Sequence, residues 1–264
     1  MDRRTFNTTL LAGAALSMMS GLGQAQTSLS SSRPVAARNV VLVHGAYADG
    51  SCWTEVIPLL QQAGLNAMSV QNPLMSFADD VAATRRILAL QDGPTVLVGH
   101  SYAGMVITEA GADPIVSSLV YIAARAPDAG EDYTALAKKY PTPPASAGLV
   151  KANGFAQLGE EAFLRDFAGD IDPAKARVLY AVQGRISDTL FNAKTSVAAW
   201  RSKPSFYAVS TQDRTINPDL ERFMAARMKA KTIELEASHL SLISRPREVA
   251  SLILEAAGQS TPQV

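Results

Sequence analysis

One segment of the chain specifies a strand, a tight turn and a helix in immediate succession. The apolar, β-branched run Val96–Val98 leads into Gly99–Gly104 (GHSYAG), and a helix-compatible segment, 105–110, follows. A serine at the tip of such a turn is typical of a nucleophile elbow, which holds the hydroxyl on a strained backbone. Ala103 replaces the second glycine of the usual G-x-S-x-G pattern but is still small enough to avoid a clash. An ordinary strand-to-helix loop is the alternative interpretation.

Strand-like and helix-like segments alternate on both sides of this turn. Short apolar runs such as 39–43 are expected of strands that are buried on both faces. The pattern predicts strands at 39–43, 66–70, 95–98, 116–123, 205–210 and 232–235, and helices at 53–63, 77–90, 103–110, 218–229 and 246–257. Such alternation predicts an α/β fold, with a mostly parallel central sheet and helices on both faces.

The alternation stops between about residues 125 and 204. This stretch contains the proline-rich segment 141–144 and helix-like pieces at 160–167 and 173–182, and we expect no buried strand in it. It is too long to be a plain loop. We therefore predict a helical cap inserted over the carboxyl edge of the sheet.

The first residues resemble an export signal rather than part of the fold. Arg3 and Arg4 precede a mildly apolar stretch at 10–22, and a small-x-small cleavage site follows at 23–25. The adjacent arginines favour the twin-arginine route, and the apolar stretch is too short for a stable membrane span. We expect a signal peptide at 1–25, a flexible lead at 26–38, and a periplasmic or extracellular mature protein.

Composition narrows the possible functions. The chain has 264 residues, 47% of them apolar, which is enough for one well-buried domain. Its formal net charge is +0, so nothing favours nucleic acid or an anionic membrane as a partner. Cys52 is the single cysteine, which excludes an intrachain disulfide and a cysteine metal cluster. Only three histidines, His44, His100 and His239, are available for chemistry.

A serine hydroxyl needs a base, and the base needs a carboxylate to orient it. His239 follows the predicted strand 232–235 by four residues, and Asp213 follows the strand 205–210 by three. Like Ser101, both lie beyond the carboxyl end of a strand, where ligands bind in open α/β sheets. We therefore predict that Ser101, Asp213 and His239 are catalytic.

Asp128 is an alternative source of the carboxylate, because it follows the predicted strand 116–123. Asp213 is favoured because it leaves its strand sooner and precedes His239 by one strand-helix-strand step. Turn or helix-capping roles are the alternative interpretations of Asp213 and His239.

Hydrolysis also needs donors for the oxyanion. The backbone N–H of Tyr102, at the start of the helix after Ser101, is one candidate, and the N–H of Ala46 is the other. Ala46 lies in the loop after the predicted strand 39–43, and Gly45 in the same loop lets its backbone approach the site closely. We expect His44 and His100 to have structural roles.

The segments Val41–Ala46, Gly99–Gly104 and Ser238–His239 resemble the α/β-hydrolase superfamily, over residues 39–264. The chain is most similar to the small esterases that include plant methylesterases, hydroxynitrile lyases and bacterial pyrethroid or carbamate hydrolases. The resemblance implies a Ser-His-Asp triad, a helical cap, no cofactor or metal, and a small-molecule ester substrate. Leu240 stands where the lyases have a lysine, which argues against lyase activity.

The sequence therefore predicts a secreted serine hydrolase of carboxylic esters. A small-ligand binding protein with little turnover, or a hydrolase of amide or C–C bonds, remains an alternative. Candidate substrate contacts are aromatic side chains near the site or in the cap, each equally able to belong to the core: Tyr47, Trp53, Phe163 and Trp200, with Tyr102, Phe155 and Phe167 as further candidates.

Overall fold

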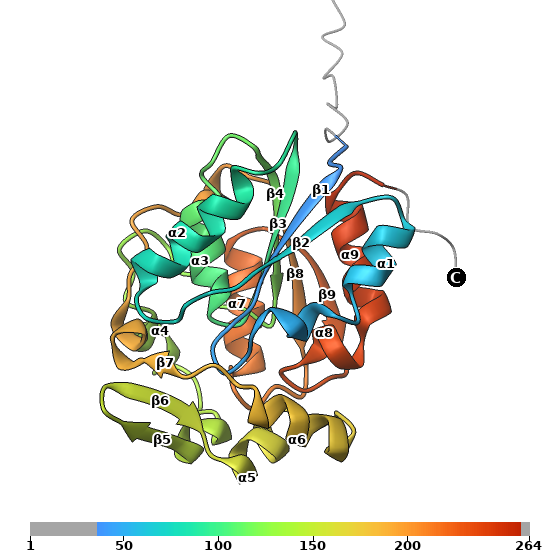
Figure 1. Cartoon of the computed structure of the whole chain (residues 1–264). Helices are drawn as coiled ribbons and strands as arrows, with labels where there is room; N and C mark the ends of the chain where they lie inside the picture. Colours follow the sequence, from blue (N-terminus) through green and yellow to red (C-terminus); the bar gives the residue numbers. More distant parts are fainter. Residues whose placement is uncertain (1–35, 260–264) are drawn as a thin grey trace, which may run out of the picture. The chain divides into compact units, whose positions relative to one another are not determined.

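The computed structural model describes residues 36–259, and its centre is a six-stranded parallel sheet (Figure 1). The strand order is β2-β1-β3-β4-β8-β9. All neighbouring strands in it run parallel. The strands are β1 (Asn39–Val43), β2 (Asn66–Val70), β3 (Thr95–His100), β4 (Val116–Ile122), β8 (Ser205–Ser210) and β9 (Lys231–Leu235). The predicted fold class is confirmed: the sheet is parallel, and β1, which is apolar apart from Asn39, is buried along its entire length.

Helices cover both faces of this sheet. Helices α2 (Phe77–Leu88) and α3 (Ala103–Ala110) pack together on one face, and α1 (Ile57–Gln62) and α9 (Pro246–Ala256) on the other (Figure 1). Helix α7 (Pro218–Arg227) packs against β8, and the short α8 (Ser241–Ser244) precedes α9.

Local sequence signals explain where these helices begin. The Ser76 hydroxyl accepts a hydrogen bond from the Asp79 amide and caps α2. The predicted helix 53–63 begins later than expected, at Ile57, after a 3₁₀ turn, η1 (Gly50–Trp53). Pro58 lies in the first turn of α1, where its missing N–H is tolerated, and it prevents the helix from extending back through that position.

The segment 125–204 also contains short strands, which the expected helical cap did not include. The strands β5 (Leu149–Ala152), β6 (Phe155–Leu158) and β7 (Ile186–Ser187) form a small antiparallel sheet. Asn153 and Gly154 join β5 to β6 with φ angles of 52° and 78°, as a two-residue hairpin turn requires. The hairpin was not expected from the sequence, because β5 is largely exposed and lacks the apolar run of a buried strand.

The helical elements of this segment include both predicted pieces. The piece at 160–167 divides into α5 (Glu160–Ala162) and a π-helical turn, η3 (Phe163–Phe167), and the next is α6 (Pro173–Ala181). The remaining elements are α4 (Tyr133–Ala137) and the 3₁₀ turns η2 (Pro144–Gly148), η4 (Asp188–Asn192) and η5 (Ala199–Arg201). Figure 1 shows β5, β6 and α6 beyond the end of the sheet where β1 finishes.

The predicted signal peptide, 1–25, and most of the predicted lead, 26–38, lie outside the described residues. Between residues 36 and 259, no helix combines the length and the apolar character needed to span a bilayer.

Candidate active site

Ser101 lies at the turn between β3 and α3, in the left-handed region with φ of 56°. Its amide donates to the Ile122 carbonyl (3.1 Å), and its carbonyl accepts from the Gly104 amide (3.0 Å). Gly99 permits the tight turn, because a Cβ at this position would lie 2.8 Å from the Ala103 carbonyl oxygen. Ser101 is a non-glycine residue held in the left-handed region, and this backbone strain is expected at a nucleophile elbow.

Ser101, His239 and Asp213 form one chain of hydrogen bonds. The Ser101 hydroxyl lies 2.7 Å from His239 Nε2, and His239 Nδ1 lies 2.5 Å from Asp213 Oδ2. In this geometry the imidazole donates from Nδ1 to the carboxylate and accepts from the serine hydroxyl at Nε2. Ser101 is 6% exposed and His239 is fully buried, so the chain of contacts is almost sealed from solvent.

Two backbone amides hold the carboxylate of Asp213, and a second acid interacts with it. Its Oδ1 accepts from the amides of Thr215 (2.6 Å) and Ile216 (2.9 Å), and this leaves Oδ2 for His239. Glu221 of α7 is fully buried behind it. Burial, together with the charge of Asp213 and a hydrogen bond to it, raises the pKa of Glu221 well above its ordinary value. The raised pKa favours the neutral form of Glu221, which can donate to Asp213.

His239 is also fixed by groups that surround its ring. His100 Nε2 donates to the His239 carbonyl (3.0 Å), and burial holds the pKa of His100 well below its ordinary value. Phe167, at the end of η3, packs over His239 with ring centroids 5.0 Å apart. The inserted segment thus covers the site directly through η3, a π-helical turn of the kind often found at functional sites.

The loop after β1 lies against Ser101. Gly45 allows this approach, and Tyr47 has a left-handed φ of 60° two residues later. His44 stabilises the loop, because its Nδ1 donates to the Gly45 carbonyl and its Nε2 accepts from the Asn72 amide, both at 2.9 Å. Burial lowers the pKa of His44, so a structural role as a neutral ring agrees with the geometry.

The two amides predicted to bind an oxyanion belong to Ala46 in this loop and to Tyr102 after Ser101. Within residues 36–259, neither amide donates to a protein acceptor. The Tyr102 side chain turns toward α2, where its hydroxyl donates to Asp80 (2.9 Å). The backbone of Tyr102 therefore belongs to the elbow, while its side chain is anchored away from it.

A buried carboxylate ties the inserted segment to the Asp213 loop. Asp166 in η3 has no exposed side-chain surface and pairs with Arg165 and Arg214 at 2.8 and 2.7 Å. Arg214 directly follows Asp213 in the sequence. Hydrogen bonds and charge from the two arginines lower the pKa of Asp166. The ion pair between Asp166 and Arg214 therefore fixes η3 to the loop that carries Asp213.

Two small cavities adjoin the site. One, of about 190 Å³, is lined by Tyr47, Arg125 and Thr215 among others, and a second, of about 160 Å³, shares Arg125 and Thr215. Tyr47 and Phe163 also line a very narrow crevice of about 10 Å³. A larger cavity, of about 650 Å³, is at the opposite edge of the sheet, around Pro94 and Lys203. Ligands of open α/β sheets bind at the carboxyl ends of strands, so the two small cavities are the relevant ones.

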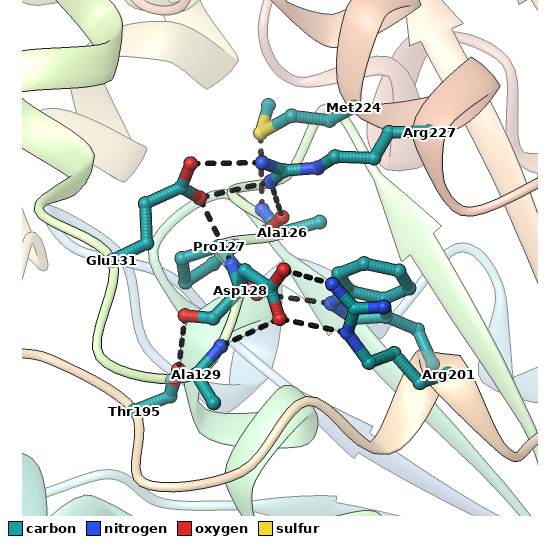
Figure 2. A network of polar contacts seen from close by, with 10 residues as sticks. Ala126, Pro127, Asp128, Ala129, Glu131, Thr195, Arg201, Met224 and Arg227 are labelled. Carbon is teal, nitrogen blue, oxygen red and sulfur yellow. Dashed lines mark hydrogen bonds and ion pairs between the residues drawn. The ribbon is translucent and has the colours of Figure 1, made fainter.

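Other predicted substrate contacts lie elsewhere. Trp53 is fully buried and lines none of these cavities, and Trp200 donates its indole N–H to the Pro127 carbonyl. Asp128, the alternative carboxylate, pairs with Arg201 (Figure 2), whereas Asp213 is the residue that contacts His239. The structure thus brings Tyr47 to one of the two small cavities and Phe163 to the narrow crevice, but places Trp53 and Trp200 in the core.

Cys52 and the possible metal ligands among the described residues do not form a second reactive or metal-binding site. Cys52 is buried, and burial raises its pKa well above the ordinary value, which disfavours the nucleophilic thiolate. Across the part of the chain that the structure describes, no three histidine, cysteine or acidic side chains gather as a metal site would require.

Sequence reasoning missed three buried residues that support the site: Asp80, Asp166 and Glu221. Each is an acidic residue on a segment that also carries apolar core residues, which is a detectable signal for a buried carboxyl group. Their partners come from distant elements, so the sequence does not indicate what each one contacts.

Comparison with known proteins agrees with this architecture. A family model described as the alpha/beta hydrolase family matches residues 40–252. The carbendazim hydrolyzing esterase of Nocardioides sp. (strain SG-4G) is 34% identical over 129 residues, which are 42% of this chain and 52% of that protein. Polyneuridine aldehyde esterase of Rauvolfia serpentina is 23% identical over 252 residues, covering 83% of this chain and 95% of that protein.

Solved structures give the same result for the fold. The crystal structure of a pyrethroid hydrolase from Sphingobium faniae JZ-2 has a TM-score of 0.69 and 20% identity, covering 84% of this chain and 97% of that one. These comparisons confirm the resemblance to small esterases that the sequence motifs indicated.

Proposed function

Because the chain belongs to the alpha/beta hydrolase family, we propose that it is a serine hydrolase that cleaves carboxylic esters through a covalent seryl intermediate. The observation that carries the proposal is the chain of hydrogen bonds from Ser101 through His239 to Asp213, which begins at a strained elbow. The esterases among its relatives support an ester as the substrate.

The first half of the reaction forms the acyl-enzyme. Ser101 Oγ attacks the ester carbonyl carbon while His239 Nε2 takes the hydroxyl proton, and Asp213 stabilises the resulting imidazolium. The amides of Ala46 and Tyr102 stabilise the oxyanion. The tetrahedral intermediate then collapses, the bond from the carbonyl carbon to the alkoxy oxygen breaks, and His239 returns its proton to the departing alcohol.

The second half hydrolyses the seryl ester. Water attacks the acyl carbon as His239 Nε2 takes its proton, and the bond to Ser101 Oγ breaks. The proton returns to Ser101, and the carboxylic acid leaves. Neither half needs a cofactor, because protons and electron pairs balance among the three side chains, the ester and water.

Replacement of the nucleophile tests this proposal. Ser101→Ala should reduce hydrolysis of a short p-nitrophenyl ester by about 10⁴-fold or more, since the nucleophile is lost while the fold is kept. Thermal unfolding should be similar to that of wild type. Activity close to wild type in this variant would overturn the proposal.

Labelling with a fluorophosphonate probe separates this proposal from a binding protein with little turnover. An activated Ser101 displaces fluoride from phosphorus and is covalently labelled, whereas a serine without an activating base is not. Mass spectrometry should locate the adduct on the peptide that contains Ser101. Amide substrates of matched shape, assayed in parallel, test hydrolysis of that bond class by the same residues.

We also propose that the protein is exported, from the adjacent arginines and apolar stretch of residues 1–25. N-terminal sequencing of protein recovered from the periplasm or medium should begin near residue 26. Retention of Met1 on protein confined to the cytoplasm would contradict export.

A further inference from the structure

We infer that Arg125 binds a carboxylate on the substrate, so that this enzyme prefers esters whose acyl or alcohol part carries a carboxylate group. This inference rests on the proposed ester hydrolysis and names the substrate class for the same site.

Arg125 is attached directly to the nucleophile elbow. Its amide donates to the Ser101 carbonyl (3.0 Å). Its side chain lines both cavities beside the site, together with Thr215, which is two residues from Asp213; Tyr47, next to Ala46, lines one of them. A group bound by this guanidinium would therefore lie beside the loops that carry Ala46 and Asp213.

Arg125 is the only charged residue that lines either cavity in the part of the chain that the structure describes. The other lining residues are apolar or neutral polar, for example Phe191 and Ser146. A single guanidinium in such surroundings gives a strong preference for an anion, because a carboxylate can accept two parallel N–H bonds from it.

The neighbouring arginines already have acidic partners, but Arg125 does not. Arg201 pairs with Asp128, and Arg227 pairs with Glu131 (2.8 Å). Within residues 36–259, no carboxylate forms an ion pair with Arg125, and its Nε is buried without an acceptor. A substrate carboxylate would supply the acidic partner that this guanidinium lacks.

The backbone on both sides of Arg125 is fixed before any ligand binds. Ala123 has a left-handed φ of 43°, and both the amide and the carbonyl of Ala124 bind the Tyr207 hydroxyl. Figure 2 shows the following residues, in which Ala126 binds Met224 and Arg227. Little ordering is therefore needed to present this arginine to a substrate.

The side chain is also oriented by an aromatic ring. The Arg125 guanidinium carbon lies 4.6 Å from the centroid of the Tyr133 ring. Stacking on one face leaves the edge of the guanidinium, which carries its N–H donors, available for a planar carboxylate. Tyr133 lines the second cavity beside Arg125, so both residues face the same space.

Matched substrates test this inference. The first pair is 4-(butanoyloxy)benzoate and 4-(butanoyloxy)benzamide, which differ only by a carboxylate in the alcohol part. The second pair is monomethyl adipate and methyl 6-amino-6-oxohexanoate, which differ in the acyl part. We expect wild type to favour the carboxylate ester in at least one pair by about tenfold to a hundredfold in kcat/KM.

Three variants separate recognition of the anion from general damage. Arg125→Gln should erase the preference, and Arg125→Lys should keep part of it, while both should still hydrolyse the neutral ester of each pair. Arg201→Gln removes an equal charge from a nearby arginine that lines neither cavity, and it should keep the preference. Equal rates within both pairs, or a preference that survives in Arg125→Gln, would overturn the inference.

A binding measurement keeps this result separate from the test of ester hydrolysis. Calorimetric titration of 4-hydroxybenzoate and adipate, the carboxylate products, needs no turnover. We expect at least one to bind wild type about tenfold or more tightly than it binds Arg125→Gln. Equal affinities would overturn the inference even if all four esters are hydrolysed. If no ester is hydrolysed but this difference in affinity appears, only the proposed reaction has failed.

Discussion

Gly45 approaches Ser101 so closely that a Cβ built on Gly45 would be 2.6 Å from the Ser101 Cβ and 2.8 Å from the His100 carbonyl oxygen. Real Cβ atoms do not approach other heavy atoms this closely. The absence of a side chain at Gly45 therefore sets the distance between the loop that carries Ala46 and the elbow.

Gly45→Ala should lower kcat/KM by about 100-fold, because the loop must move and the Ala46 amide would then miss the oxyanion. The overpacked site should also reduce the free energy of unfolding by about 1–3 kcal/mol. Gly93→Ala is the matched control, since a Cβ at Gly93 meets no atom within 4 Å. Equal activity of the two variants, measured with one p-nitrophenyl ester, would contradict this account.

The raised pKa of Asp80 should make the free energy of unfolding depend on pH. Burial raises the pKa of Asp80 to about 6 from an ordinary 3.8. Between these values the folded protein binds more protons than the unfolded chain, so the stabilisation contributed by Asp80 is lost as pH rises from about 4 to 6. The change should reach about 3 kcal/mol at most.

Asp80→Asn should remove this slope, because an amide does not titrate. Urea unfolding at intervals from pH 4 to 7 measures it, with Asp79→Asn, an exposed acid on the same helix, as the control. We expect wild type to lose stability relative to Asp80→Asn as the pH rises. A constant difference between these two proteins over that range would count against a raised pKa.

Glu221 should be replaceable by glutamine but not by leucine. In its neutral form Glu221 can donate to Asp213 while it accepts from the Ser210 amide (3.1 Å), and glutamine can do both. We expect Glu221→Gln to keep kcat within a few-fold, and Glu221→Leu to lose about tenfold or more because two buried groups lose a partner. Equal loss in the two variants, compared at equal folded fraction, would show that hydrogen bonding is not the role of Glu221.

Asp166 should affect both stability and turnover. Asp166→Ala leaves Arg214 without its acid and loosens the loop that carries Asp213, so we expect a loss of about 1–3 kcal/mol and a lower kcat. Glu161→Gln is the control, because Glu161 pairs with the same Arg165 at an exposed position and should change stability by less than about 1 kcal/mol. Denaturant unfolding and steady-state kinetics on both variants check this, and similar effects of the two would be contrary to expectation.

The central sheet was largely predictable because each of its strands carries a local signal. The bounds expected for β1 and β8 are those of the structure, since their apolar runs end at polar residues. The hairpin of β5 and β6 was missed although Asn153 and Gly154 mark its turn. Its strands are stabilised by partners from the same small sheet rather than by complete burial, so periodicity gives little signal.

Some residues of the site could likewise be predicted from the sequence, and others could not. Ser101, Asp213 and His239 could be chosen from the sequence because each follows a strand, and the parallel sheet brings the ends of its strands to one edge. Arg125 and Asp80 could not, because their importance depends on contacts with Tyr133 and Tyr102, which lie on other elements. The end of a strand can be recognised from neighbouring residues in the sequence, whereas the partner of an ion or a hydrogen-bonding group depends on tertiary packing.

The ion pair of Asp166 with Arg214 also limits how this enzyme can be re-engineered. Exchanging the segment 125–204 with that of a relative would transplant specificity only if the donor supplied an acid for Arg214. A chimera without that acid would acquire a new pocket over a displaced Asp213. Grafts in this scaffold should therefore be designed as pairs, with the inserted segment and the loop after β8 taken from the same parent.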